Sequence, residues 1–160
     1  MLRGFGMSPA QSRSFVMGVA LSAVVVAAPA FAQDAAQPAA PVLALDGDAA
    51  TITVLIKPDK TADFEAVLSK LKESLAKNEN PVRKQQAAGW TIYKANSPGP
   101  NGNTIYVMLI TPIVKDQEYD ISRLIAEVFP VEVAEYFEKY KGAFVGRGIS
   151  PMTKLMSMGQ

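Results

Sequence analysis

The sequence predicts an α+β fold in which helices cover one face of an antiparallel sheet. Three observations lead to this prediction. Residues 51–57 alternate like a strand, residues 61–78 carry an apolar stripe with helical spacing, and two apolar, aromatic-containing runs within residues 90–113 flank a loop of Pro, Gly and Asn. A polar bridge and a second helical region follow, so the chain combines both kinds of element.

The first strand and the first helix follow directly from their residue patterns. In "TITVLIK" (51–57) the β-branched residues that favour strands predominate, and Pro58 ends the run. In residues 61–78 an apolar residue recurs every three or four positions, which predicts an amphipathic helix. The apolar stripe of this helix comprises Phe64, Val67, Leu68, Leu71 and Leu75.

Residues 79–89, "ENPVRKQQAAG", are predicted to be a polar connector. Arg83 and Lys84 form an adjacent basic pair within it. A contact with an anion is one interpretation of the pair. A solvated loop is favoured, because isolated basic pairs are ordinary protein surface.

A hairpin is predicted from residues 90–96 and 104–113, with the turn at Asn101-Gly102. Its second strand is apolar on both faces, which predicts a central place in the sheet, next to strand 51–57. One face carries Ile105, Val107 and Leu109, and the other carries Tyr106, Met108 and Ile110.

Two helices are predicted after the hairpin, over residues 121–129 and 131–141, with Pro130 between them. Gly142 is expected to follow the end of the second helix. The predicted inner stripe of that helix comprises Val133, Tyr136, Phe137 and Tyr140. Residues 147–160 are either a loose tail or a final edge strand, the strand being expected within 152–158.

This order of elements is the split βαβ arrangement of a ferredoxin-like sandwich, here spanning residues 50–146. Because helices cover one face only, the apolar residues on the other face of the central strand need a cover as well. A second copy of the sheet supplies one, so we expect a homodimer with twofold symmetry.

The first 32 residues read as a secretory signal peptide. Arg3 and Arg13 precede the apolar run "FVMGVALSAVVVAA", and Ala30 and Ala32 have the spacing of a cleavage site, which predicts cleavage after Ala32. The protein is then periplasmic or secreted, and translation starts at Met1 or Met7. An uncleaved membrane anchor is the alternative. Residues 33–49, rich in Ala and Pro, are expected to be a flexible lead-in.

Composition excludes several kinds of chemistry. The chain has no cysteine and no histidine, so it has no disulfide, no lipid-modified cysteine, no Ser-His-Asp or Cys-His catalytic group and no histidine-ligated zinc or haem. Loss of the two signal-peptide arginines leaves 14 basic and 15 acidic residues, a net charge of −1. This balance predicts binding neither to nucleic acid nor to an anionic membrane.

The stretch "KPDKTADFEAV" together with the order of elements resembles the dimeric α/β-barrel superfamily. This superfamily includes antibiotic-biosynthesis-monooxygenase-like domains and stress-responsive barrel domains. The chain is also similar to uncharacterised secreted bacterial proteins. The resemblance covers residues 50–145 and implies a dimer and, in some members, cofactor-independent oxygenase activity. Haem-degrading members use a histidine ligand, which this chain lacks.

We expect a non-catalytic dimer that binds a small apolar ligand or a protein partner, without a cofactor. A cofactor-independent oxygenase or isomerase and an envelope-anchored structural subunit are the alternatives. The candidate ligand-binding residues are Trp90, Tyr93 and Tyr106, because aromatic side chains on a hairpin suit an apolar ligand; packing within the sheet is the simpler interpretation of each.

Two further clusters contain side chains of the kinds that bind metals, but neither is predicted to be a metal site. Asp116, Glu118 and Asp120 resemble part of a calcium loop, but a solvated turn is favoured because the glycine and the distal glutamate of such a loop are missing. The methionines near the C-terminus are soft ligands suited to copper(I), but packing on a partner subunit is favoured. They are Met152, Met156 and Met158.

Overall fold

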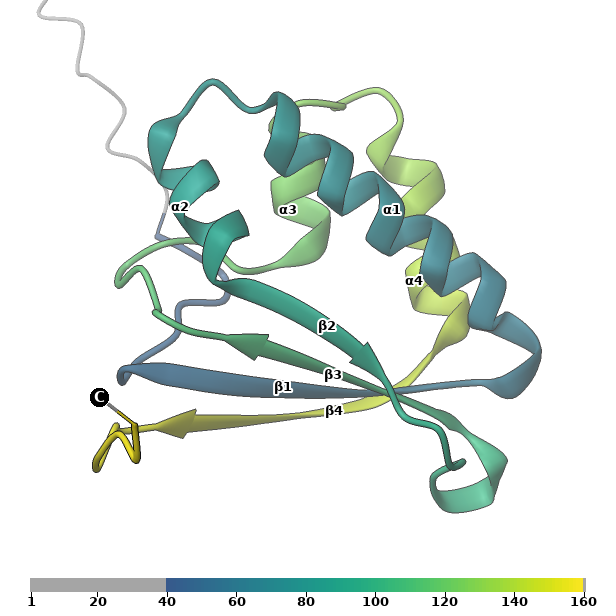
Figure 1. Cartoon of the computed structure of the whole chain (residues 1–160). Coiled ribbons are helices and arrows are strands. Elements are labelled where there is room, and N and C mark those ends of the chain that lie inside the picture. Colours follow the sequence, from purple (N-terminus) through teal and green to yellow (C-terminus); the bar gives the residue numbers. More distant parts are fainter. Residues whose placement is uncertain (1–39, 160) are drawn as a thin grey trace, which may run out of the picture. The chain divides into compact units, whose positions relative to one another are not determined.

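A computed structural model describes residues 40–159, and over these residues the chain has the predicted α+β fold (Figure 1). The predicted signal peptide and residues 33–39 of the lead-in lie outside the described residues. The strands are β1 (Ala49–Ile56), β2 (Trp90–Lys94), β3 (Thr104–Ile110) and β4 (Phe144–Met152). The helices are α1 (Thr61–Lys77), α2 (Pro81–Gly89), α3 (Ile121–Ala126) and α4 (Val133–Ala143), with 3₁₀ turns at Pro58–Lys60 and Pro100–Gly102.

The four strands form one antiparallel sheet in the order β2-β3-β1-β4, the ferredoxin-like arrangement. β3 pairs with β1 on one side and with β2 on the other, so the strand that is apolar on both faces is central, as predicted. The register places Trp90 opposite Ile110 and Lys94 opposite Tyr106. At the hairpin turn Asn101 and Gly102 both have positive φ, which explains the Asn-Gly pair.

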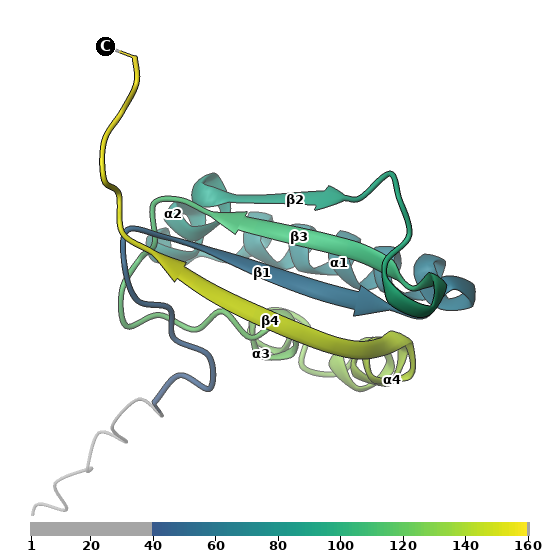
Figure 2. The same cartoon turned by 90° about the horizontal axis from the view of Figure 1, so that it is seen from below.

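All four helices lie on the same face of the sheet (Figures 1 and 2). The core lies between the helices and this face. Burial alternates along β1, whose even-numbered residues point inward, and on β3 the inward residues are Tyr106, Met108 and Ile110. They pack with the predicted apolar stripe of α1, so the residues on one face of each of these two strands form the core.

The predicted connector at 79–89 is wrong, because most of it forms α2. Asn80 caps this helix, since its side-chain oxygen accepts a hydrogen bond from the backbone N–H of Val82 at 3.0 Å. Pro81 occupies the first turn, where its missing N–H leaves no hydrogen bond unmade. An Asn-Pro pair before a run of Gln and Ala is thus a start signal for a helix that polarity alone conceals.

The two later helices differ from their predicted lengths. α3 ends at Ala126, and α4 begins only at Val133 and continues through Gly142 to Ala143, directly before β4. Phe137, predicted on the inner stripe, is 46% exposed. Val133, Tyr136 and Tyr140 do pack against the core, as predicted.

Both ends of the domain differ from expectation. The last strand is β4 at the edge of the sheet, so it begins earlier than the strand expected within 152–158. The described part of the lead-in packs on the domain: Leu45 is only 3% exposed, and the carbonyl of Leu43 accepts a hydrogen bond from Tyr119 N–H at 2.8 Å. Ordered structure therefore begins before residue 50. Within residues 40–159 no helix is long and apolar enough to cross a membrane.

Candidate functional site

An apolar groove of about 690 Å³ runs between α1 and the edge strand β2. We refer to it as the α1–β2 groove. α1 contributes Leu68, Leu71 and Leu75 to it, with Ser69 and Lys72 beside them. β2 contributes Trp90, Ile92 and Lys94, and β3 contributes Tyr106.

The groove exists because the helices cover the sheet unevenly. Figure 2 shows α3 and α4 on the β4 side of the sheet. On the β2 side, α2 lies only near the start of β2. The alternation of strand residues turns Trp90, Ile92 and Lys94 toward α1. The apolar stripe of α1 is wide enough to serve both the core and the groove.

Trp90 lines the groove with its ring packed against Tyr119, the ring centroids being 5.6 Å apart. Its indole Nε1 is buried and has no hydrogen-bond partner among the described residues. A buried donor without an acceptor costs about 1–3 kcal/mol. Because Nε1 is shielded from solvent, it lies beneath the surface of the groove, and the ring of Trp90 rather than its N–H forms part of the groove wall.

Tyr106, Glu65 and Lys94 form a polar cluster at the groove. The Tyr106 hydroxyl and Lys94 Nζ both donate to Glu65 Oε1, at 2.7 and 2.8 Å. Burial, with the hydrogen bond to Glu65, raises the pKa of Tyr106 to about 12. The hydrogen bond between Lys94 and Glu65 lowers the pKa of Glu65 and raises that of Lys94. All three pKa values therefore move away from neutrality, and this cluster has no group suited to proton transfer near pH 7.

The structure brings two of the three predicted site residues together. Trp90 and Tyr106 line the same groove. Tyr93 pairs with Val107, lies on the opposite face of the sheet and is 55% exposed. Strict alternation along β2 already separates Trp90 from Tyr93, so this difference was readable from the sequence. The helix side of the groove was missed, because the leucines of α1 read as core residues only.

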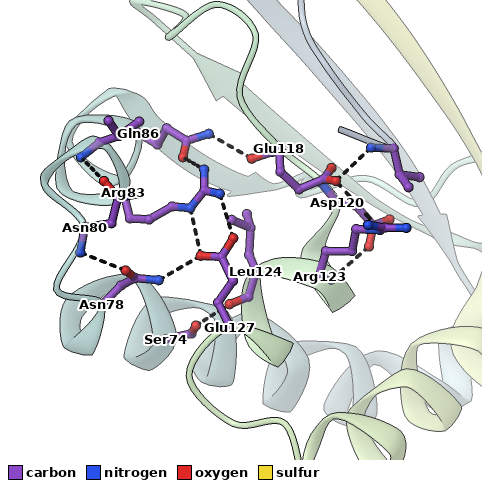
Figure 3. Close-up of polar contacts among 12 residues, drawn as sticks. Ser74, Asn78, Asn80, Arg83, Gln86, Glu118, Asp120, Arg123, Leu124 and Glu127 are labelled. Carbon is purple, nitrogen blue, oxygen red and sulfur yellow. Dashed lines mark hydrogen bonds and ion pairs between the residues drawn. The ribbon is translucent and has the colours of Figure 1, made fainter. Parts of the chain in front are cut away.

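A polar network fixes the position of α2 (Figure 3). Trp90 follows α2 without an intervening residue, so the network also positions Trp90. Arg83 donates from Nε and Nη2 to the two carboxylate oxygens of Glu127, at 2.9 and 2.6 Å. Arg83 Nη1 also donates to Gln86 Oε1 at 2.6 Å, and Gln86 Nε2 donates to the carbonyl of Glu118 at 2.9 Å. The preference for a solvated Arg83 is wrong, since it is only 7% exposed.

Two members of the acidic cluster at 116–120, Glu118 and Asp120, have structural roles. Glu118, 8% exposed, accepts hydrogen bonds from the backbone N–H groups of Val42, Leu43 and Asp120 at 2.8–3.0 Å. Burial alone raises the pKa of Glu118, but these backbone donors outweigh it and the net shift is downward. Asp120 caps α3 through Arg123 N–H. Glu118 thus is not part of a solvated turn, and within residues 40–159 no three acidic side chains gather as a metal site.

Comparison with known proteins adds no assignment: no family model, no curated protein and no solved structure matches this chain.

Proposed function

We propose that this protein is a periplasmic or secreted homodimer that binds a small apolar ligand in the α1–β2 groove. The supporting observation is the groove itself, whose lining is mainly apolar and includes the Trp90 ring and three leucines of α1. Its volume of about 690 Å³ falls in the range of small-molecule sites, roughly 300–1,000 Å³. Such sites combine apolar walls with a few polar groups that orient the ligand.

A binding role is favoured over catalysis by the chemistry around the groove. The chain has no histidine or cysteine. The pKa values of Glu65, Lys94 and Tyr106 lie further from neutrality than those of isolated side chains. General acid–base catalysis works best with a pKa near the working pH. A groove that only retains its ligand has no such requirement.

Binding is tested with the fluorescence of Trp90, the single tryptophan of the chain. A neutral apolar probe such as N-phenyl-1-naphthylamine is expected to change this emission in a saturable way. Ala76, exposed on α1, lines the groove, so Ala76→Phe is expected to weaken binding at least about tenfold by filling it. Ala62→Phe, exposed on the same helix but outside the lining, is the matched control. Equal binding by both variants contradicts the proposal.

The dimer is proposed from the face of the sheet opposite the helices. Leu55, Ile105, Val107 and Leu109 lie there and are only partly buried. On β4 the neighbouring positions include Gly146 and Gly148, where an added Cβ would meet nothing within 4 Å. Packing within one subunit therefore does not require glycine there. Close approach of a second sheet supplies a reason for these glycines and covers the apolar residues.

Native mass spectrometry or sedimentation of the mature protein tests the dimer. Val107→Glu places a charge in the centre of the open face and is expected to give monomers. Val131→Glu is the matched control, because Val131 is 92% exposed between α3 and α4. A monomeric wild-type protein, or a Val107→Glu variant that remains dimeric, would refute this assembly.

A cofactor-independent oxygenase or isomerase remains the second candidate, favoured by the meeting of Trp90 and Tyr106 in one groove. In that case Trp90→Phe, which keeps the apolar surface, should depress turnover without unfolding the protein. Unchanged turnover on a verified substrate removes Trp90 from the reaction. The third reading, an envelope-anchored subunit, requires the N-terminal residue of the mature protein to be Met1 or Met7.

A further inference from the structure

We propose that the ligand of the α1–β2 groove is an amphipathic carboxylate, with its apolar tail in the groove and its carboxylate at Lys72. This inference rests on the proposed function and adds the chemical class of the ligand. The observation that carries it is an imbalance of polar groups. Among the described residues, two lysines line the groove and no acidic side chain does.

The two lysines differ in whether an acidic side chain of the protein already pairs with them. Lys94 is paired with Glu65 at 2.8 Å, so its charge is largely balanced within the protein. Lys72 lies on the exposed side of α1 and forms no ion pair with any other residue of the described range 40–159. By contrast, Lys70 and Lys77, its neighbours on the same helix, are both paired with Glu73. Lys72 is thus the free cation beside the groove.

None of the remaining polar groups that the structure describes at the groove adds a negative charge to its lining. Trp90 Nε1 is shielded from solvent, so it presents no donor to a ligand in the groove. The Ser69 hydroxyl already donates to the Glu65 carbonyl at 2.9 Å, and the Tyr106 hydroxyl donates to the Glu65 carboxylate. The charged groups that the described groove lining offers to a ligand are therefore one unpaired cation and no anion. A ligand whose polar end is an anion complements Lys72, whereas a cationic head group does not.

The shape of the groove requires an apolar body of moderate length. Its α1 wall extends from Leu68 to Ala76, about 12 Å at 1.5 Å per helical residue. The walls facing this stretch are Ala87, Trp90 and Ile92. A medium-chain or aromatic carboxylic acid meets these requirements, and burial of its tail supplies most of the binding free energy.

The test compares three probes that share one tail: decanoate, decanol and decyltrimethylammonium. Each is titrated into the purified mature protein at low salt, and Trp90 fluorescence reports binding. Decanoate is expected to bind about tenfold more tightly than decanol, and decyltrimethylammonium more weakly than both. Added salt is expected to reduce the preference for decanoate, because Lys72 is exposed to solvent.

Lys72→Gln is expected to lower decanoate affinity about tenfold, to the level of decanol, and to leave decanol affinity unchanged. Lys84→Gln, which alters an exposed lysine outside the groove lining, is expected to change neither. Equal affinity for decanoate and decanol, or a preference that survives Lys72→Gln, overturns this inference while the groove remains an apolar site. Failure of all three probes to bind overturns both this inference and the proposed function.

Discussion

Arg83 and Lys84 show how little a residue's type says about its role. They are adjacent and have the same charge, yet Arg83 is 7% exposed and paired with Glu127, whereas Lys84 is exposed on α2. The partner Glu127 lies 44 residues away in the sequence. A local sequence pattern cannot reveal a partner so far along the chain. The basic pair is therefore recognisable in the sequence, but which of its two members is buried is not.

Replacement of Arg83 is therefore expected to destabilise the fold. Arg83→Ala removes three hydrogen bonds and leaves Gln86 Oε1 and Glu127 Oε1 without a donor, which should cost about 2 kcal/mol of unfolding free energy. The full penalty of a buried pair is not expected, because Glu127 is exposed enough to regain water. Lys84→Ala should change stability by less than about 0.5 kcal/mol. Urea denaturation followed by circular dichroism measures both, and equal midpoints would show that the network contributes nothing.

At the scale of elements, strong periodicity was a reliable guide and short polar segments were not. β1 and α1 were predicted because each has a regular period of apolar residues, and β3 because it is a continuous apolar run that follows a turn. α2 was missed because it is short and its buried residues include Arg83 and Gln86, so burial there depends on partners rather than on hydrophobicity. The groove wall formed by α1 was also missed. The leucine stripe predicts that one face of α1 is apolar, but it does not predict which part of that face the sheet leaves uncovered.

The junction between α2 and β2 depends on Gly89. A Cβ built at this position would lie 2.8 Å from the carbonyl oxygen of Pro112, and the Gly89 carbonyl accepts a hydrogen bond from Thr111 N–H at 2.7 Å. Gly89→Ala is expected to destabilise the protein by about 1–3 kcal/mol, because the neighbour is backbone and cannot turn away. It should also change the emission of the adjacent Trp90.

Gly142→Ala provides the control of opposite sign. Gly142 lies within α4, and a Cβ there would meet nothing within 4 Å. Alanine is the better helix former, so stability is expected to rise by about 0.5–1 kcal/mol. Thermal unfolding of both variants checks the pair. If Gly89→Ala stabilises as Gly142→Ala does, the close approach at Pro112 is not a constraint.

At the scale of the whole molecule, the ferredoxin-like arrangement followed from the order of elements, but the limits of the domain did not. The lead-in is predicted to be flexible because it is rich in Ala and Pro. Such a composition reports local properties of the chain and contains no information on distant contacts. Residues 42 and 43 are nevertheless held by the Glu118 carboxylate, about 75 positions along the chain. The C-terminal strand could not be placed either. Gly146, Gly148 and Pro151 are unfavourable in strands, so the sequence of this segment does not show a strand pattern, and the segment forms a strand because it pairs with β1.

Leu45 decides whether the segment before β1 belongs to the folded domain. Its side chain is 3% exposed and joins the core, whereas Val42 in the same segment is 59% exposed. Leu45→Ala is expected to lower the unfolding free energy by about 2–5 kcal/mol through lost burial and the cavity that remains, while Val42→Ala should change it by less than about 0.5 kcal/mol. Urea midpoints of the two variants make the comparison. Equal midpoints would mean that the segment is a tether, and a midpoint lowered in Leu45→Ala alone places the start of the domain before β1, where the Glu118 carboxylate holds the chain.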